Sequence, residues 1–118
     1  MKIVSISQEE ILFDNKMAIT QQHEQDCCEA VYADFEQLND TSIKNETFNN
    51  GVNVVEHQLG FVIYSDSGNS YYVPCYNIQN GYYSDNLSIT FPSKSKGNNK
   101  KWNYQTINIK NKNEGDHY

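Results

Sequence analysis

The side chains best suited to chemistry in this 118-residue chain are a few histidines and cysteines. His23, Cys27 and Cys28 lie within six positions of one another. A thiolate beside an imidazole is the pair that a cysteine hydrolase uses, and both residue types also bind zinc. His57 and Cys75 are the other side chains of these types that could complete a metal site.

The spacing of these residues is not that of a known type of reactive centre. The chain has no C-x-x-C pair, and neighbouring cysteines on a strand point to opposite faces. There is also no glycine-rich elbow, P-loop or dinucleotide-binding fingerprint. We therefore expect Cys27 and Cys28 to pack as small hydrophobic side chains, in a protein that is not an enzyme and has no cofactor. A metal- or thiol-dependent site around His23 is the alternative.

The charge is unevenly distributed, although the whole chain carries a net −6. Residues 1–60 contain 11 acidic side chains and three lysines, whereas residues 61–118 are net positive. There is no arginine, which argues against sequence-specific reading of DNA. An acidic face could dock on the basic groove of a nucleic-acid enzyme, or it could simply be solvated. The residues predicted for this face are Glu24, Asp26, Glu29, Asp34 and Glu36.

A basic segment near the C-terminus is followed directly by aromatic residues. Lysines can follow a phosphate backbone while aromatic rings stack on bases, so this segment is a candidate RNA contact. The alternative is a solubilising loop followed by a core strand. Two tyrosines beside a predicted turn are further candidates for partner contact. The predicted contact residues are Tyr82, Tyr83, Lys94, Lys96, Lys100, Lys101, Trp102 and Tyr104.

Alternation of polar and apolar residues predicts a single domain, residues 1–118, of α+β class that is predominantly antiparallel β with one short helix. The helical turns are expected at 34–39, a basic loop at 92–101 and a flexible tail at 110–118. Pro74 lacks a backbone N–H, so we expect its strand to lie at an edge or to leave the sheet there. The predicted strands are 2–7, 11–13, 17–21, 29–33, 52–58, 61–65, 70–76, 87–91 and 102–109.

Two motifs together resemble those of a family of small uncharacterised proteins from phages and bacteria. Residues 23–32 (HEQDCCEAVY) are similar to its H-x-Q-D-C-C-E-x-V-Y signature, and residues 80–85 (NGYYSD) to its N-G-Y-Y-S signature. The intervening segment 34–43 is also similar, so the likeness covers roughly residues 10–91. The resemblance implies a small β-rich domain from a phage or mobile element, and it does not indicate any particular activity.

The combined expectation is a cytoplasmic binding protein. The N-terminus has no apolar segment of the secretory type, and no apolar run is long enough to span a membrane. Small size, acidity and the phage-type resemblance favour an inhibitor of a host defence nuclease, of the anti-CRISPR kind, which binds the nuclease or its guide RNA. A virion accessory protein is a further alternative.

Overall fold

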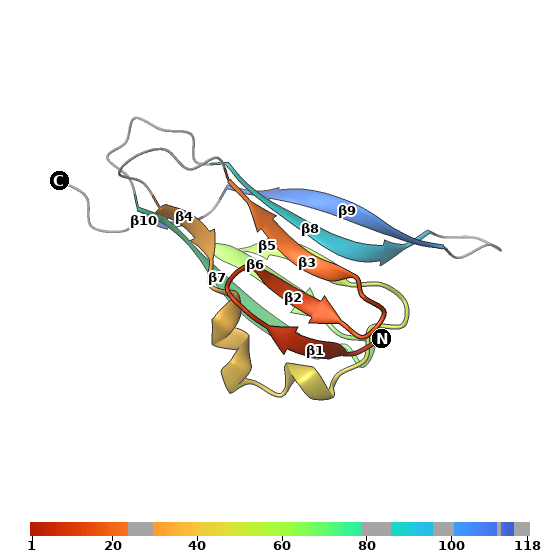
Figure 1. Ribbon diagram of the computed structural model, residues 1–118. Coiled ribbons are helices and arrows are strands. Elements are labelled where there is room, and N and C mark those ends of the chain that lie inside the picture. Colours follow the sequence, from red (N-terminus) through yellow and green to blue (C-terminus); the bar gives the residue numbers. More distant parts are fainter. Residues whose placement is uncertain (24–29, 79–85, 96–100, 111, 115–118) are drawn as a thin grey trace.

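The computed structural model describes residues 1–23, 30–78, 86–95, 101–110 and 112–114, and in these the chain forms two facing β-sheets (Figure 1). The strand pairing is antiparallel except between β7 and β10. Helical content in the described residues is limited to two short 3₁₀ helices, η1 (Phe35–Asp40) and η2 (Ile43–Asn45). The expected β-rich fold is therefore confirmed. The strands are β1 (Ile3–Ile6), β2 (Glu10–Phe13), β3 (Ala18–Gln22), β4 (Ala30–Ala33), β5 (Asn53–His57), β6 (Gly60–Tyr64), β7 (Ser70–Ile78), β8 (Leu87–Lys94), β9 (Trp102–Ile109) and β10 (Asn113–Glu114).

The first sheet has the strand order β1-β2-β3-β8-β9. Its first three strands are consecutive, and the tight turn after β2 places one residue in the left-handed backbone region. Lys16 has φ 72°, and the Asn15 side chain accepts a hydrogen bond of 3.1 Å from the Met17 N–H. The partner of β3 on its other side is β8, with Thr20 opposite Thr90, so the sheet is completed from the far end of the sequence.

The second sheet is built on β7, the longest strand. Its first half pairs with β6 and its second half with β4, while β5 lies beyond β6. The strand does not leave the sheet at Pro74, but its first half does lie at an edge, because Ser70–Pro74 pair with β6 on one side and the pairing with β4 on the other side begins only at Cys75. The Pro74 carbonyl accepts from the Asp34 N–H, just past the end of β4, and the bond to the β6 side comes from the Cys75 N–H to the Leu59 carbonyl. The missing N–H of proline therefore faces the point where β4 ends.

The core lies between the two sheets and is filled by the inward-facing alternate residues of both. Ile11, Phe13 and Ile89 represent the first sheet in this core, and Phe61 and Ile63 the second, all at most 1% exposed. The 3₁₀ helices cover one open edge of the sandwich (Figure 1). From that edge the core receives four more fully or almost fully buried side chains: Phe35, Leu38, Ile43 and Phe48.

The seam between β4 and the first sheet is closed by the side-chain amides of Gln21 and Gln8. Gln21 Nε2 donates to the Ala33 carbonyl at 3.0 Å and to the Gln8 carbonyl at 2.7 Å, and Gln21 Oε1 accepts from the Ala33 N–H at 2.6 Å. Gln8 Nε2 also donates to the Ala33 carbonyl. Ala33 is fully buried, so these amides replace the strand partner that its backbone otherwise lacks on that side.

Gln21→Met is therefore expected to destabilise the fold by about 2–3 kcal/mol. Methionine keeps the length and volume but leaves the Ala33 N–H buried without its partner, which costs the desolvation of that group. Urea unfolding measures the effect, and Gln22→Met is the matched control because Gln22 is exposed on the same strand. The control is expected to stay within about 0.5 kcal/mol of wild type. Equal losses for both variants would contradict the role of Gln21.

Two carboxylates fasten the turn between β6 and β7 to the segment after η2. Asp66 accepts from the backbone N–H groups of Asn49 (2.7 Å) and Asn50 (3.4 Å). Glu46 accepts from the Tyr71 hydroxyl, Asn69 Nδ2 and Ser67 Oγ, and these hydrogen bonds, led by that from Tyr71, lower the pKa of Glu46. These two acidic residues therefore have a structural use that their sequence positions do not reveal.

Two expected segment boundaries differ in the structure. Strand β8 continues through Pro92 to Lys94, so the first part of the predicted basic loop is paired, with Pro92 opposite Tyr104. In the predicted tail, Asn113 and Glu114 form β10, parallel to β7 at Tyr76 and Asn77. Neither extension has a clear polar–apolar alternation of its own. Each forms by pairing with a neighbouring strand, β9 in the first case and β7 in the second. Within the described residues, no helix has the length and apolarity needed to cross a bilayer.

Candidate functional site

The β8–β9 hairpin carries a cluster of cationic and aromatic side chains at the end where β8 connects to β9. The register places Lys94 opposite Trp102 and Pro92 opposite Tyr104 on the outer face of the first sheet. The ammonium of Lys94 lies over the Trp102 ring, 4.8 Å from the ring centroid, which is cation–π geometry. Tyr104 is 51% exposed, and its hydroxyl accepts a 3.3 Å hydrogen bond from the Ala18 N–H. We call Lys94, Lys101, Trp102 and Tyr104 the hairpin tip cluster.

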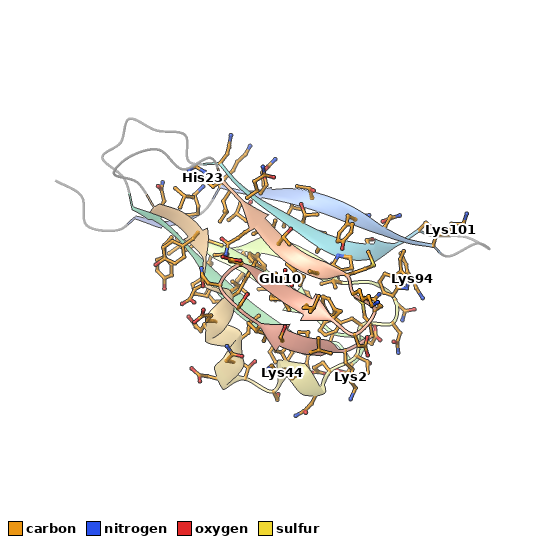
Figure 2. All side chains as sticks on the ribbon, viewed as in Figure 1. Lys2, Glu10, His23, Lys44, Lys94 and Lys101 are labelled. Carbon is orange, nitrogen blue, oxygen red and sulfur yellow. The ribbon has the colours of Figure 1, made fainter. Side chains whose placement is uncertain are left out.

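Hydrogen bonds between Ser95 and Lys101 hold the two strands together beyond the Lys94–Trp102 pair. The Ser95 N–H donates to the Lys101 carbonyl at 2.9 Å, and the Lys101 N–H donates to Ser95 Oγ at 3.0 Å. Figure 2 shows Lys94 and Lys101 at one end of the molecule, and His23 at the other. The structure thus brings together four of the six predicted residues of the basic segment. Lys96 and Lys100 lie outside the described residues.

The predicted acidic face is only partly within the described residues. Asp34 is half-buried and precedes η1, and Glu36 is exposed in the first turn of that helix. They therefore stand on the edge of the sandwich that the 3₁₀ helices cover (Figure 1). Glu24, Asp26 and Glu29 lie outside the described residues, so a shared acidic face stays a prediction.

The candidate metal and thiol residues that lie within the described part of the chain are not arranged as a reactive site. Cys75 is fully buried in the core, and burial raises the pKa of its thiol to about 12, so it is a neutral thiol at physiological pH. His57 is exposed on the second sheet, with its ring edge-on against Tyr72. In the described part of the chain, no three His, Cys, Asp or Glu side chains form a group that could hold a metal ion. Cys27 and Cys28 lie outside that part.

Residues of the first motif and described residues that flank the second motif meet at one end of the sandwich. Gln22 pairs with Ser88, Ala30 pairs with Ile78, and the His23 ring contacts the Asn86 carbonyl through Nδ1. An open hollow of about 280 Å³ lies here, next to the Tyr32 ring, which packs on Tyr76 at 5.4 Å between centroids. Tyr82 and Tyr83 are outside the described residues. The hollow is lined by Gln8, Glu9, Gln21, His23, Val31 and Tyr32.

A surface that the sequence analysis did not single out is the outer face of the second sheet. Its register sets three rows of outward-facing positions side by side, and one row is Val55, Val62 and Tyr72. Val55 and Tyr72 are 45% and 38% exposed. The sequence feature that indicates this face is the absence of charged residues at alternate positions, namely 53, 55, 57 and 70, 72, 74. This pattern does not reveal a surface in the sequence, because the residues come from separate strands whose pairing the sequence does not show.

Comparisons with known proteins leave these sites to be interpreted from their own chemistry. No protein-family model matches the chain, and searches of curated proteins and of solved structures give no match either.

Proposed function

We propose that the protein is a non-enzymatic binding protein whose hairpin tip cluster contacts single-stranded RNA. The observation that carries the proposal is the Lys94–Trp102 pair at 4.8 Å, with Tyr104 exposed on the next outward-facing position of the same strand. Aromatic faces bind bases irrespective of sequence, and lysines neutralise phosphates without reading bases. The cluster supplies both kinds of group on one surface.

The distribution of charge favours a local and shallow contact. The chain is acidic overall, so phosphates are repelled by most of its surface. The tip concentrates Lys94 and Lys101 at one end, whereas Lys2 and Lys44 lie apart from them (Figure 2). We therefore expect weak affinity that depends strongly on salt, with little preference for sequence.

The finer proposal concerns the partner in the cell. We propose that the RNA belongs to a ribonucleoprotein defence nuclease in the host cytoplasm, and that the chain inhibits it as a phage-encoded binding protein. The resemblance of residues 23–32 and 80–85 to proteins of phages and bacteria supports this origin, and the acidic N-terminal half suits a basic nuclease groove. Purification of the nuclease with the bound chain, before and after ribonuclease treatment, tests whether RNA is part of the contact.

Lysine substitutions at the tip test RNA binding directly. The double variant Lys94→Ala with Lys101→Ala is expected to bind a fluorescent single-stranded oligonucleotide about tenfold more weakly than wild type, because two phosphate contacts are lost. Fluorescence anisotropy measures the change. The matched control is Lys2→Ala with Lys44→Ala, which removes the same charge from exposed positions elsewhere. If the two double variants weaken binding equally, net charge and not the tip is responsible.

A further inference from the structure

The outer edge of β9 is a free strand edge of the first sheet. In the described residues β9 pairs with β8 alone, and Figure 1 shows it as the outermost strand of its sheet. Its eight residues include no proline and no charged side chain, and its register with β8 is unbroken. Natural sheets usually block an edge of this length with a charge, a proline, a bulge or a covering segment. β9 therefore keeps an edge on which a further strand can pair.

The edges of β1 and β5 are protected in these usual ways. β1 has only four residues, its register with β2 is irregular between Ile3 and Ser5, and the 3₁₀ helices lie against it (Figure 1). β5 has five residues, and one of them is the charged Glu56. The unprotected edge of β9 is thus a particular feature of this strand and not a general property of the two sheets.

The hydrogen-bond pattern shows which backbone groups of β9 face the free edge. The Pro92 carbonyl accepts from the Val52 N–H, on the side of β8 away from β9, whereas the Ser95 N–H donates to the Lys101 carbonyl across the hairpin. Odd-numbered residues of β8 therefore bond to β9, and by the same register odd-numbered residues of β9 bond to β8. The N–H and C=O groups of the even-numbered residues point away from β8. These residues are Trp102, Tyr104, Thr106 and Asn108.

The hairpin that carries this edge is positively charged, although the chain is acidic. Residues 87–110 contain five lysines and no acidic residue, in a chain with a net charge of −6. Lys101 precedes β9 and Lys110 follows it, so a cation lies at each end of an uncharged strand. Just past β9, the Lys110 N–H already donates to a carboxylate oxygen of Glu56 at 2.5 Å. The edge therefore matches a strand that is uncharged in its middle and acidic at its ends.

We propose that β9 binds an extended acidic segment of a partner protein, which adds to the five-stranded first sheet as a sixth strand. The free edge presents N–H donors and C=O acceptors at the spacing of a strand, and a polypeptide supplies the complement of both. The phosphates of a nucleic acid only accept hydrogen bonds, so they cannot pair with the carbonyls. A second copy of β9 would bring lysines to both ends of the edge, where like charges repel.

This site is separate from the proposed RNA contact. The RNA would lie on the outward-facing side chains of the hairpin tip cluster, whereas the added strand lies in the plane of the sheet and bonds to the backbone of β9. Thr106 is outside the tip cluster and has its N–H on the free edge. A substitution at Thr106 therefore tests strand addition without removing any group assigned to RNA binding.

Thr106→Pro removes this N–H, which is not bonded to β8, and proline is tolerated where the N–H of an edge strand faces solvent. The probe is a fluorescein-labelled peptide, Glu-Glu-Val-Thr-Val-Thr-Val-Glu-Glu, followed by fluorescence anisotropy. We expect wild type to bind it saturably with a Kd on the order of 100 µM, and the proline variant to bind at least about tenfold more weakly. The matched control is Thr106→Val, which loses the same hydroxyl group but keeps the N–H and should bind as wild type does.

Hydrogen exchange of the wild-type chain provides a readout that does not depend on the folding of a variant. With the peptide bound, the amides of Tyr104 and Thr106 should exchange at least about tenfold more slowly. Those of Gln105 and Ile107 already bond to β8 and should change little. Strand addition therefore predicts protection that alternates along β9.

Four results would overturn the proposal. The first is no binding of the acidic peptide by wild type up to about 1 mM. The second is equal binding by the proline and valine variants, and the third is equal binding of a peptide with lysines in place of the glutamates. The fourth is alternating protection that appears with rising protein concentration or with RNA instead of with the peptide, which would identify a second copy or a nucleic acid as the occupant.

Discussion

Gly60→Ala is expected to lower the free energy of unfolding by at least about 3 kcal/mol, at the upper end for overpacking. A Cβ at this position would lie 2.2 Å from the Val73 carbonyl oxygen and 3.1 Å from the Pro74 Cα. Both neighbours are backbone atoms of the central strand β7, so neither can rotate away. The added methyl group therefore separates β6 from β7, which are the middle of the second sheet.

Thermal unfolding followed by circular dichroism measures this loss, which corresponds to roughly 10–15 °C in Tm for a chain of this size. The control is Gly68→Ala, where an added Cβ meets nothing within 4 Å. Gly68 has φ 87°, so its substitution costs about 1 kcal/mol of backbone strain and no clash. A Gly60 variant no less stable than the Gly68 variant would contradict the close approach of β6 and β7.

Phe48→Ala is expected to cost about 3–5 kcal/mol, the range for deleting a fully buried phenylalanine. Phe48 is 0% exposed although it lies in a segment without a strand or helix, and its ring meets Phe13 edge-on at 5.6 Å. Its N–H also donates to the Met1 carbonyl at 2.9 Å. The side chain therefore attaches the connection between η2 and β5 to the first sheet.

Urea denaturation measures the loss, and Val55→Ala serves as the control because Val55 is an exposed apolar side chain on β5. We expect the control to change stability by no more than about 0.5 kcal/mol. If Phe48→Ala is equally mild, the segment after η2 contributes little to the core.

Local patterns predicted the hairpins well. The Asp-Asn-Lys turn joins β2 to β3, and the Asp-Ser-Gly-Asn segment joins β6 to β7, as expected from turn residues between alternating apolar runs. The β9 bounds, Trp102–Ile109, agree with the sequence prediction. These elements were predictable because each one depends on neighbours within about ten residues.

Contacts between distant segments could not be predicted in the same way. The pairing of β3 with β8 joins residues some 70 positions apart, as Thr20 and Thr90 show. Pro74 predicted an edge or the end of pairing, but the strand continues to Ile78, since the missing N–H falls where β4 ends and η1 begins. Both outcomes are set by the packing of the two sheets, and no local preference encodes that packing.

The candidate sites, too, could be predicted from the sequence only in part. Composition alone singled out the lysines and aromatics of the hairpin tip cluster, and the β8–β9 register then placed Lys94 over Trp102. The sequence did not predict a surface at Val55, Leu59 and Tyr72. Exposed apolar residues can be recognised as one surface only when the strands that carry them are known to be adjacent.

Trp102 is the only tryptophan in the chain, so its fluorescence reports directly on the hairpin tip cluster. Titration with a single-stranded RNA is predicted to quench this emission to saturation, because a base stacks on the ring. The binding constant should fall about sevenfold between 50 and 200 mM salt if two phosphates are neutralised. RNA that leaves the Trp102 emission unchanged, or that binds with the same affinity at both salt concentrations, would contradict the proposed contact.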